Sequence, residues 1–275
     1  MITGVTRLAA VIGHPVRHSL SPALHNAAFA AAGVDWSYLA FDVAPGRADD
    51  ALSAMRTLGL GGLSVTMPHK DDVARAVDVL DPAARALGTA NTVVPMADGR
   101  LAGHSTDGAG FVASLIEADV DPCGMRVAVI GAGGAARSVI DALARCGVDS
   151  IRVINRSAAK ALIAAELGAG RGAVGTFSDV ATADLVVNAT SVGMGTDDLP
   201  VTPDLLRAGQ VVADLVYHPI ETALLRLATA VGAHPVDGLG MLIHQAVLQQ
   251  ALWTGVRPDP AVMREAARQE LARRR

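Results

Sequence analysis

Residues 127–136 read Val-Ala-Val-Ile-Gly-Ala-Gly-Gly-Ala-Ala, and this stretch decides the fold that the sequence predicts. Its β-branched beginning predicts a buried strand that leads directly into a glycine-rich turn and a helix. Gly131 suits a tight turn, Gly133 lets the backbone come close to a pyrophosphate, and Ala136 is small enough for contact between helix and sheet. Phosphate groups would lie at the N-terminus of that helix. The stretch therefore predicts a Rossmann-like dinucleotide-binding domain.

The nature of the dinucleotide follows from residues 154–157, which read Ile-Asn-Arg-Ser about twenty residues further on, where an NAD site carries an acidic residue. An acid there binds a ribose 2′-hydroxyl, whereas Arg156, with Lys160 one helical turn later, would attract a 2′-phosphate. A glycine-rich turn alone is weak evidence, and Arg156 alone is equally consistent with a solvated arginine at a strand end. Together, the turn, the spacing and the basic pair favour NADP.

Composition restricts the class of protein. The 275 residues, 51% of them hydrophobic, are enough for two domains of ordinary size. A net charge of -4 with scattered basic residues argues against a nucleic-acid partner. Cys123 and Cys146 are too few for a disulfide framework or a cysteine zinc site. Aromatic residues make up only 3%, so we expect a core of small aliphatic side chains, which suits parallel sheets covered by helices.

Targeting and membrane signals are not found in the sequence. The N-terminus lacks a basic region followed by an apolar run, and no apolar stretch approaches the length of a membrane span. We therefore expect a cytoplasmic protein with no membrane partner. The sequence does not decide between a monomer and a homodimer.

Strand-like and helix-like segments alternate along most of the chain, which predicts two α/β domains with parallel or mostly parallel sheets. In the first half we expect strands at 7–12, 36–43 and 62–66, and helices at 21–32 and 48–58. In the second half we expect strands that begin at Val127 and lie at 151–154, 185–188 and 211–215.

The crossing between the domains is expected at the polar, glycine-rich segment 98–110, which precedes an amphipathic helix at 111–118. After residue 240 the pattern is helical to the end of the chain. We therefore assign 1–104 to a first domain and 105–239 to a second, and the helices expected at 240–275 must pack onto existing structure. Glycines near 103–110 and 237–240 would serve as a hinge between the two domains.

Several short motifs occur in a fixed order along the chain. They are His18-Ser19-Leu20-Ser21-Pro22, Ser64-Val65-Thr66-Met67-Pro68-His69-Lys70, Ala90-Asn91-Thr92, Thr106-Asp107-Gly108-Ala109-Gly110, the glycine-rich turn, Asn155-Arg156-Ser157, Asn188-Ala189-Thr190-Ser191-Val192-Gly193-Met194, Asp214-Leu215-Val216-Tyr217-His218-Pro219, and Gly240-Met241-Leu242-Ile243-His244-Gln245-Ala246. Over essentially its whole length, the sequence resembles the shikimate dehydrogenase family.

The resemblance implies a substrate domain at 1–104, completed by the C-terminal helices at 240–275, and an NADP domain at 105–239. It also implies the reversible reduction of 3-dehydroshikimate to shikimate by NADPH. It assigns Lys70 and Asp107 as the catalytic pair, which also contacts substrate. The other substrate residues it implies are Ser19, Ser21, Thr66, Asn91, Tyr217 and Gln245. The cofactor residues it implies, together with those argued above, are Gly131, Ala132, Gly133, Gly134, Ala135, Asn155, Arg156, Ser157, Lys160, Thr190, Leu215 and Gly238.

The catalytic pair is also reasonable on chemical grounds. Hydride addition to a carbonyl carbon leaves negative charge on oxygen, which the ammonium of Lys70 would stabilise and protonate. The carboxylate of Asp107 would orient that ammonium and keep it charged. Without the resemblance, a surface lysine that begins a helix after Pro68 explains Lys70 better, and an N-cap explains Asp107 equally well.

The expected substrate contacts have ordinary alternatives too. Ser19 and Ser21 follow the first strand at the edge where α/β sheets bind ligands, but Ser21 is also placed to cap the helix that starts at Pro22. Asn91 is typical of a turn before Thr. Tyr217 is one of two tyrosines, which weakens its interpretation as core filler. Gln245 lies on an apolar helix face, where a buried amide needs partners.

The eight histidines show no ligand spacing, so we expect no metal site. His69 and His104 flank the catalytic candidates and are candidates for tuning the pH response.

Two positions depart from the family pattern, because Ser64 and Ser105 stand where the family usually carries Asn. Ser is shorter and lacks the amide donor, which puts the hydroxyl pattern of the substrate in doubt. A quinate or aminoshikimate dehydrogenase is therefore the first alternative. A non-catalytic NADP-binding protein is the second, and the presence of both Lys70 and Asp107 argues against it.

Overall fold

The computed structural model describes residues 2–274, which form two compact units. The first unit contains the chain up to Thr106 and again from Gln245, and the second is Asp107–His244. Both units are α/β, as the sequence predicted. Over residues 2–274, no helix is both long and apolar enough to cross a membrane.

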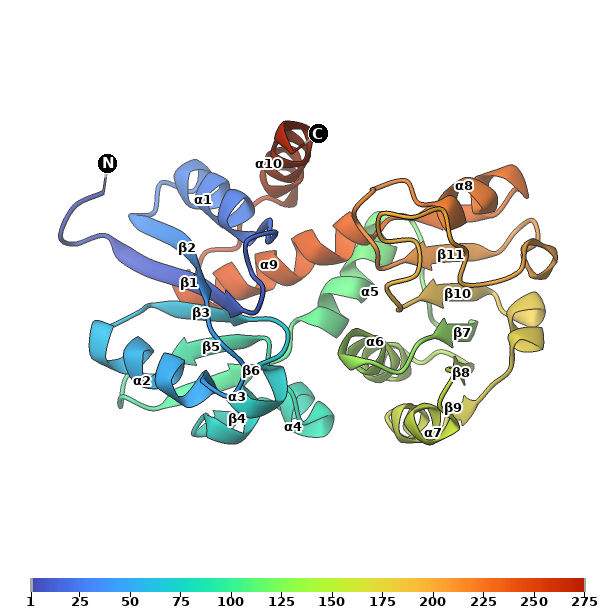
Figure 1. The fold of residues 1–275 in the computed structure, drawn as a ribbon, viewed down its shortest axis with the longest axis horizontal. Helices are drawn as coiled ribbons and strands as arrows, with labels where there is room; N and C mark the ends of the chain where they lie inside the picture. Colours follow the sequence, from blue (N-terminus) through green and yellow to red (C-terminus); the bar gives the residue numbers. More distant parts are fainter. Residues whose placement is uncertain (1, 275) are drawn as a thin grey trace. The chain divides into compact units, whose positions relative to one another are not determined.

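The sheet of the first unit has six strands in the order β2-β1-β3-β5-β6-β4 (Figure 1). The strands are β1 (Arg7–Gly13), β2 (Trp36–Asp42), β3 (Gly62–Val65), β4 (Val79–Leu80), β5 (Thr92–Pro95) and β6 (Leu101–His104). Strand β1 pairs in parallel with β2 and β3, whereas β5 runs antiparallel to β3 and β6. The expectation of a mostly parallel sheet is therefore correct for β1 to β3. Further along the sheet, β5 is antiparallel to both of its neighbours, and β4 again pairs in parallel with β6.

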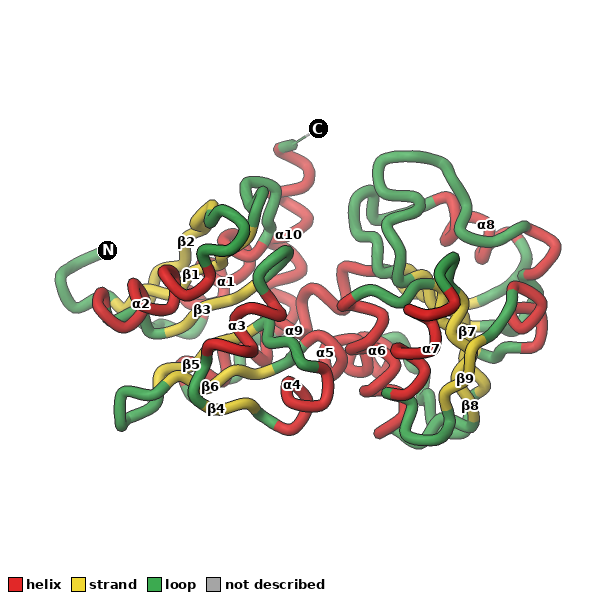
Figure 2. The backbone as a smooth tube through the Cα atoms, turned by 60° about the horizontal axis from the view of Figure 1, so that its bottom comes forward, coloured by secondary structure: helices red, strands yellow, loops and turns green. Residues whose placement is uncertain are grey.

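The helices of the first unit cover both faces of this sheet. They are α1 (Ser21–Ala31), α2 (Ala48–Leu58), α3 (Lys70–Ala76), α4 (Pro82–Leu87), the end of α9 (Gly238–Thr254), and α10 (Pro260–Arg273). Successive residues of β1 point to opposite faces. Ile12 packs in the same core cluster as Met55 of α2, and Val11 packs in the cluster of Phe29 from α1 and Trp253 from α9. Figure 2 shows α2 beside α3, which it contacts.

The second unit contains a wholly parallel six-stranded sheet in the order β12-β11-β10-β7-β8-β9. The strands are β7 (Arg126–Ile130), β8 (Ser150–Ile154), β9 (Gly172–Val174), β10 (Leu185–Asn188), β11 (Val211–Asp214) and β12 (His234–Val236). The helices are α5 (Asp107–Glu117), α6 (Gly134–Arg145), α7 (Ala158–Glu166), η1 (Phe177–Thr182), η2 (Pro203–Leu205), α8 (Ala223–Ala230) and the beginning of α9.

Small aliphatic residues fill both faces of this second sheet. Val129 belongs to the core cluster that includes Leu143 of α6, and its neighbour Ile130 belongs to the opposite cluster with Leu224 of α8. Side chains of β7 are therefore buried on both faces, which explains its continuous run of apolar residues.

The segment 98–110 contains β6 and the first turn of α5, and the boundary between the two units falls within it, after Thr106. A methyl group built at Gly103 would lie 2.9 Å from both Leu80 and Val77, so this glycine allows a strand to pack closely. At Gly108 the methyl would lie 2.3 Å from the carbonyl oxygen of Ser138 in α6, and at Gly240 it would lie 2.8 Å from Ser114 in α5. These glycines permit close packing in regular elements, and a hinge between the units stays a prediction.

Replacing Gly108 with Ala should therefore destabilise the second unit. The added methyl overlaps a backbone oxygen that cannot move independently, and overpacking of this kind costs about 1–3 kcal/mol. Gly134→Ala is the matched control, because its methyl would meet nothing within 4 Å, and it should leave stability unchanged or raise it by about 0.4–1 kcal/mol. Urea unfolding measures both. A Gly108→Ala protein as stable as the wild type would contradict the close approach of α5 to α6.

Candidate active site

The loop after β1 carries two of the expected substrate residues. Helix α1 begins at Ser21, and its N-cap residue Leu20 provides no side-chain bond. The predicted capping role of Ser21 is therefore wrong. Instead, the hydroxyl of Ser19 accepts a hydrogen bond from the backbone N–H of Ser21 at 3.2 Å. From the end of the chain, Arg274 donates to the carbonyl oxygens of His18 at 2.7 Å and Ser19 at 3.3 Å, which holds this loop in place.

Backbone hydrogen bonds bring Thr66, Lys70 and Asn91 together in the first unit. The Thr66 N–H donates to the Ile12 carbonyl at 2.9 Å, and the Val65 N–H donates to the Asn91 carbonyl at 2.8 Å. The Ala90 N–H, next to Asn91, donates to the carbonyl of Lys70 at 3.0 Å. The carboxyl ends of β1 and β3 lie together because these strands pair in parallel, and the residues that precede β5 reach the same edge because β5 runs antiparallel to β3.

Asn91 is more than a turn residue. Its side-chain oxygen accepts from the Thr106 N–H at 2.9 Å, and its amide nitrogen donates to the Thr106 hydroxyl at 2.9 Å. Only 3% of Asn91 is exposed. Lys70 is the first residue of α3 and is half-buried, so it is a helix-opening lysine but not a fully exposed one.

A buried chain of polar groups lies beneath these residues and was missed by the sequence reasoning. The Tyr38 hydroxyl donates to Ser64 at 2.6 Å, and the Ser64 hydroxyl donates to the side-chain oxygen of Gln249 at 2.7 Å. The amide nitrogen of Gln249 donates to the Asn91 carbonyl at 3.3 Å. Gln245, which is also buried, lies one helical turn before Gln249 and therefore on the same face of α9. The available signal was a pair of polar residues, Gln249 and Gln250, in an apolar helix.

The second unit holds the remaining expected substrate residues. Asp107 is the first residue of α5 rather than its N-cap, and it is 9% exposed. Tyr217 is half-buried in the loop after β11.

The glycine-rich turn has the geometry that a pyrophosphate site requires. Gly131 has a φ of 115° and lies so close to the next loop that a methyl group there would be 2.8 Å from the Ala189 carbonyl and 3.2 Å from Thr190. Gly133 and Gly134 are exposed, and nothing lies within 4 Å of a methyl group at either one. The N-terminus of α6 is thus accessible to an anion, with Ala132 and Ala135 half-buried beside it.

The basic pair lies at the end of the adjacent strand β8. Arg156 and Lys160 are both exposed. The Asn155 amide donates to the Ser157 carbonyl at 3.1 Å, and the Ser157 hydroxyl caps α7 by accepting from the Lys160 N–H at 3.4 Å. Two cationic groups therefore emerge from one capped turn, an arrangement that suits a phosphate.

A buried network shapes the other loops of this sheet edge. Asn188 accepts from the hydroxyl of Thr190 at 2.7 Å and donates to Asp214 at 2.9 Å, and the Thr222 hydroxyl donates to Asp214 at 2.7 Å. Burial raises the pKa of Asp214 above its usual value, although these hydrogen bonds oppose the shift. A methyl group at Gly238 would lie 2.6 Å from the Leu215 carbonyl. The predicted cofactor residues Thr190 and Leu215 thus lie in loops at the carboxyl ends of the strands, and Gly238, the first residue of α9, packs closely against the Leu215 loop.

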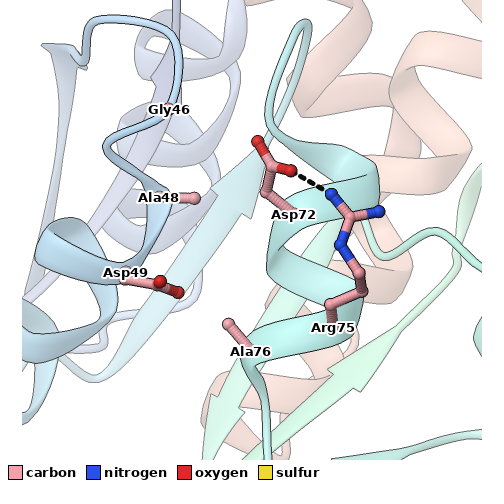
Figure 3. Close-up of a pocket in the computed structure, with 6 residues that line it drawn as sticks. All are labelled: Gly46, Ala48, Asp49, Asp72, Arg75 and Ala76. Carbon is pink, nitrogen blue, oxygen red and sulfur yellow. Dashed lines mark hydrogen bonds and ion pairs between the residues drawn. The ribbon is translucent and has the colours of Figure 1, made fainter.

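One pocket of the first unit contains none of the expected residues. It lies between the start of α2 and the helix α3, and Figure 3 shows Asp72 paired with Arg75 on its α3 side. No group of three or more His, Cys, Asp or Glu residues suited to a metal ion occurs within residues 2–274.

Comparison with known proteins identifies the family. The family model described as "Shikimate dehydrogenase substrate binding domain" matches residues 11–93, "Shikimate / quinate 5-dehydrogenase" matches 115–194, and "Shikimate 5'-dehydrogenase C-terminal domain" matches 238–268. A curated relative from Moorella thermoacetica, named shikimate dehydrogenase (NADP(+)), is 45% identical over 97% of this chain and 94% of its own length. The chain belongs to the shikimate dehydrogenase family. Another member with the same name, from Rubrobacter xylanophilus, is 46% identical over 96% of both chains.

Solved structures of shikimate dehydrogenases share the fold. One in complex with NADP+ has a TM-score of 0.94 and 36% identity, covering 98% of both chains. The Thermus thermophilus enzyme in complex with NADP(H) and shikimate has a TM-score of 0.89 and 37% identity, covering 96% of this chain and 99% of its own. A quinate dehydrogenase from Corynebacterium glutamicum in complex with NAD is similar to the same degree, with a TM-score of 0.89 and 36% identity over 96% of this chain and 99% of its own.

Beside the buried chain of polar groups lies His25, which should make stability depend on pH. It is fully buried, stacks on Tyr38 at 4.4 Å, and burial lowers its pKa to about 4 despite a hydrogen bond with the Gln250 side chain. In the unfolded chain its pKa is about 6.5, so between these values only the unfolded state binds the proton. The contribution of His25 to the free energy of unfolding is thus complete above about pH 6.5. It falls by up to about 3 kcal/mol as the pH drops to 4.

Urea unfolding at a series of pH values tests this prediction. His25→Phe keeps an aromatic ring against Tyr38 and should show a shallower loss of stability between pH 6.5 and 4 than the wild type. His18→Ala, which removes an exposed histidine, should retain the wild-type slope. Equal slopes in all three proteins would contradict the assignment.

Proposed function

We propose that this member of the shikimate dehydrogenase family catalyses the reversible, NADP-dependent reduction of 3-dehydroshikimate to shikimate. The observation that carries the proposal is the position of Lys70. Only two of the 23 basic residues are lysines, Lys70 and Lys160, and all the others are arginines. Arginine cannot release a proton at neutral pH, whereas an ammonium can. A chain that uses arginine almost everywhere has lysine where the candidate substrate residues gather.

Each substrate residue has a chemical role in this proposal. Bound NADPH supplies the hydride. Lys70 protonates the carbonyl oxygen as the alcohol forms, and in the reverse direction it accepts that proton. Asp107 orients the Lys70 ammonium and keeps it charged. Ser19 and Ser21 bind the carboxylate, and the ring hydroxyls are bound by Thr66, Asn91, Tyr217 and Gln245.

The proposed cofactor site follows from the second unit. The pyrophosphate binds the exposed N-terminus of α6, where Gly133 and Gly134 leave space for it. Arg156 and Lys160 bind the 2′-phosphate from the end of β8. The remaining contacts come from Gly131, Ala132, Ala135, Asn155, Ser157, Thr190, Leu215 and Gly238.

Quinate is the second candidate substrate. Ser64 gives its hydroxyl proton to Gln249, so this position does not offer the amide donor that is usual in the family. Initial rates with shikimate, quinate and aminoshikimate, each with NADP and NAD, test the proposal. The highest kcat/KM is expected for shikimate with NADP, and a higher value for quinate would replace the first candidate with the second. The cytoplasmic location and the oligomeric state stay predictions, which cell fractionation and sedimentation would check.

Changing Lys70 should remove proton transfer. Lys70→Ala is expected to lower kcat by roughly 10² to 10⁴-fold with a smaller change in the KM for shikimate, because a proton donor acts in the transition state. Lys70→Arg is the more informative variant, since it keeps the charge without a transferable proton and should be nearly as slow. Lys160→Ala, the matched control, should keep kcat. Near-normal turnover in Lys70→Arg would show that a positive charge at residue 70 is enough for catalysis and that this residue does not transfer the proton.

Changing Arg156 should alter the choice of cofactor. Its bond to a 2′-phosphate contributes roughly 1.5–3 kcal/mol, which is about ten- to a hundred-fold in affinity. Arg156→Asp replaces attraction by repulsion and offers an acceptor to a ribose hydroxyl, so the preference for NADP should collapse or reverse. The measurement is the ratio of kcat/KM with NADP and NAD at fixed ionic strength. An unchanged ratio, or a wild type that prefers NAD, would show that Arg156 does not bind the phosphate.

A further inference from the structure

We propose that Tyr38 and Gln249 are positioning residues for the substrate. Together with Ser64, they form a buried chain of hydroxyl and amide groups that ends at Asn91. The inference rests on the proposed function, because it takes Asn91 as a substrate contact.

The first part of this chain fixes Ser64. The Tyr38 hydroxyl, which is fully buried, donates to the Ser64 hydroxyl at 2.6 Å. The Tyr38 ring is itself held by stacking on His25 and by the nearby ring of Trp253, 6.0 Å away. Ser64 therefore faces a donor that is held in place.

The second part fixes Asn91. Gln249 is 2% exposed and uses both ends of its amide, accepting from Ser64 at 2.7 Å and donating to the Asn91 carbonyl at 3.3 Å. Asn91 is in turn held at its side chain by Thr106. An apolar residue at position 249 would leave a buried hydroxyl and a buried carbonyl without these partners, which costs more than the loss of an exposed hydrogen bond. The amide also sets the face of α9 on which Gln245 lies.

The direction of the hydrogen bonds couples positions 64 and 249. Ser64 accepts from Tyr38 and gives its only proton to Gln249. The amide group next to Ser64 is therefore the side chain of Gln249, which comes from α9. An Asn at position 64 would bring an amide from β3 instead. Both amides cannot occupy the same buried space, because Gln249 already lies at hydrogen-bond distance from the smaller serine. Ser64→Asn should therefore be tolerated only when residue 249 is small.

The test is a double-mutant cycle measured by steady-state kinetics on the full-length protein. Gln249→Ala alone and Ser64→Asn alone should each raise the KM for shikimate about tenfold, the effect of losing one to two buried hydrogen bonds. Both should change kcat less than threefold and leave the KM for NADP unchanged. In the double variant, Ser64→Asn with Gln249→Ala, the KM should return to within about threefold of the wild type. Gln269→Ala, which removes an exposed glutamine from α10, is the control and should match the wild type.

A second variant keeps the test decisive if one of the single variants folds poorly. Tyr38→Phe preserves the ring and its stacking but removes the donor, so it should also raise the KM for shikimate while its melting temperature stays close to that of the wild type. A merely structural role would lower melting temperatures and leave the KM for shikimate unchanged in the folded variants. That result overturns the inference. So does a double variant in which the increase in the KM for shikimate equals the product of the two single increases. The proposed function is tested separately by the wild type, because a wild type inactive with shikimate overturns both.

Discussion

Parallel pairing of neighbouring strands is the constraint on which both units depend. Parallel strands end at the same edge of their sheet, so the loops that follow them come together however far apart they are in sequence. In the first unit this brings the loop after β1 next to the residues that follow β3. In the second it brings the glycine-rich turn after β7 next to the loops after β8 and β10. Most candidate functional residues accordingly follow strands, whereas Asn91 directly precedes β5, which runs antiparallel to β3. The strands themselves are filled mainly with Val, Ile, Leu and Ala.

Two kinds of interior result from the composition. The second unit packs small aliphatic residues on both faces of its sheet, and glycines bring its helices close together. The first unit instead contains most of the aromatic contacts, with His25, Phe29, Tyr38 and Trp253 grouped on one face of the sheet. The polar ends of Tyr38 and Trp253 each have a partner, the Ser64 hydroxyl and the Val93 carbonyl, as is usual for such rings when they are buried.

The sequence predicted elements well where local signals were strong. Helix α2 was expected at residues 48–58 and is found there, because acidic residues occupy its first turn and Gly59 ends it in the left-handed conformation at φ 65°. The strands β4, β5, β6, β9 and β12 were not predicted, since two to four residues give no detectable alternation. The close packing at glycines was not predicted for a different reason. Whether a glycine bends the chain or lets another element approach depends on a neighbour such as Ser138, which local sequence does not reveal.

The candidate site likewise divides into residues that local sequence reveals and residues that only the fold brings together. The glycine-rich turn and Arg156 could be found because their spacing is local, and the family motifs supplied the remaining positions. Tyr38 and Gln249 were missed, since Ser64 and Gln249 are separated by 185 residues and only the fold brings them together. The capping role of Ser21 was misassigned because Ser19, two residues earlier, provides the acceptor instead.

The interrupted first unit has a consequence for the order in which the protein folds during synthesis. The second unit is one continuous segment, whereas the core of the first includes Trp253, which leaves the ribosome only after the whole second unit has been made. Domains fold as units while the chain grows. The dinucleotide-binding half therefore completes its folding first, although its synthesis begins later. Until then, one face of the nascent N-terminal sheet lacks its tryptophan and α10, and in this interval the chain is most exposed to chaperones and proteases.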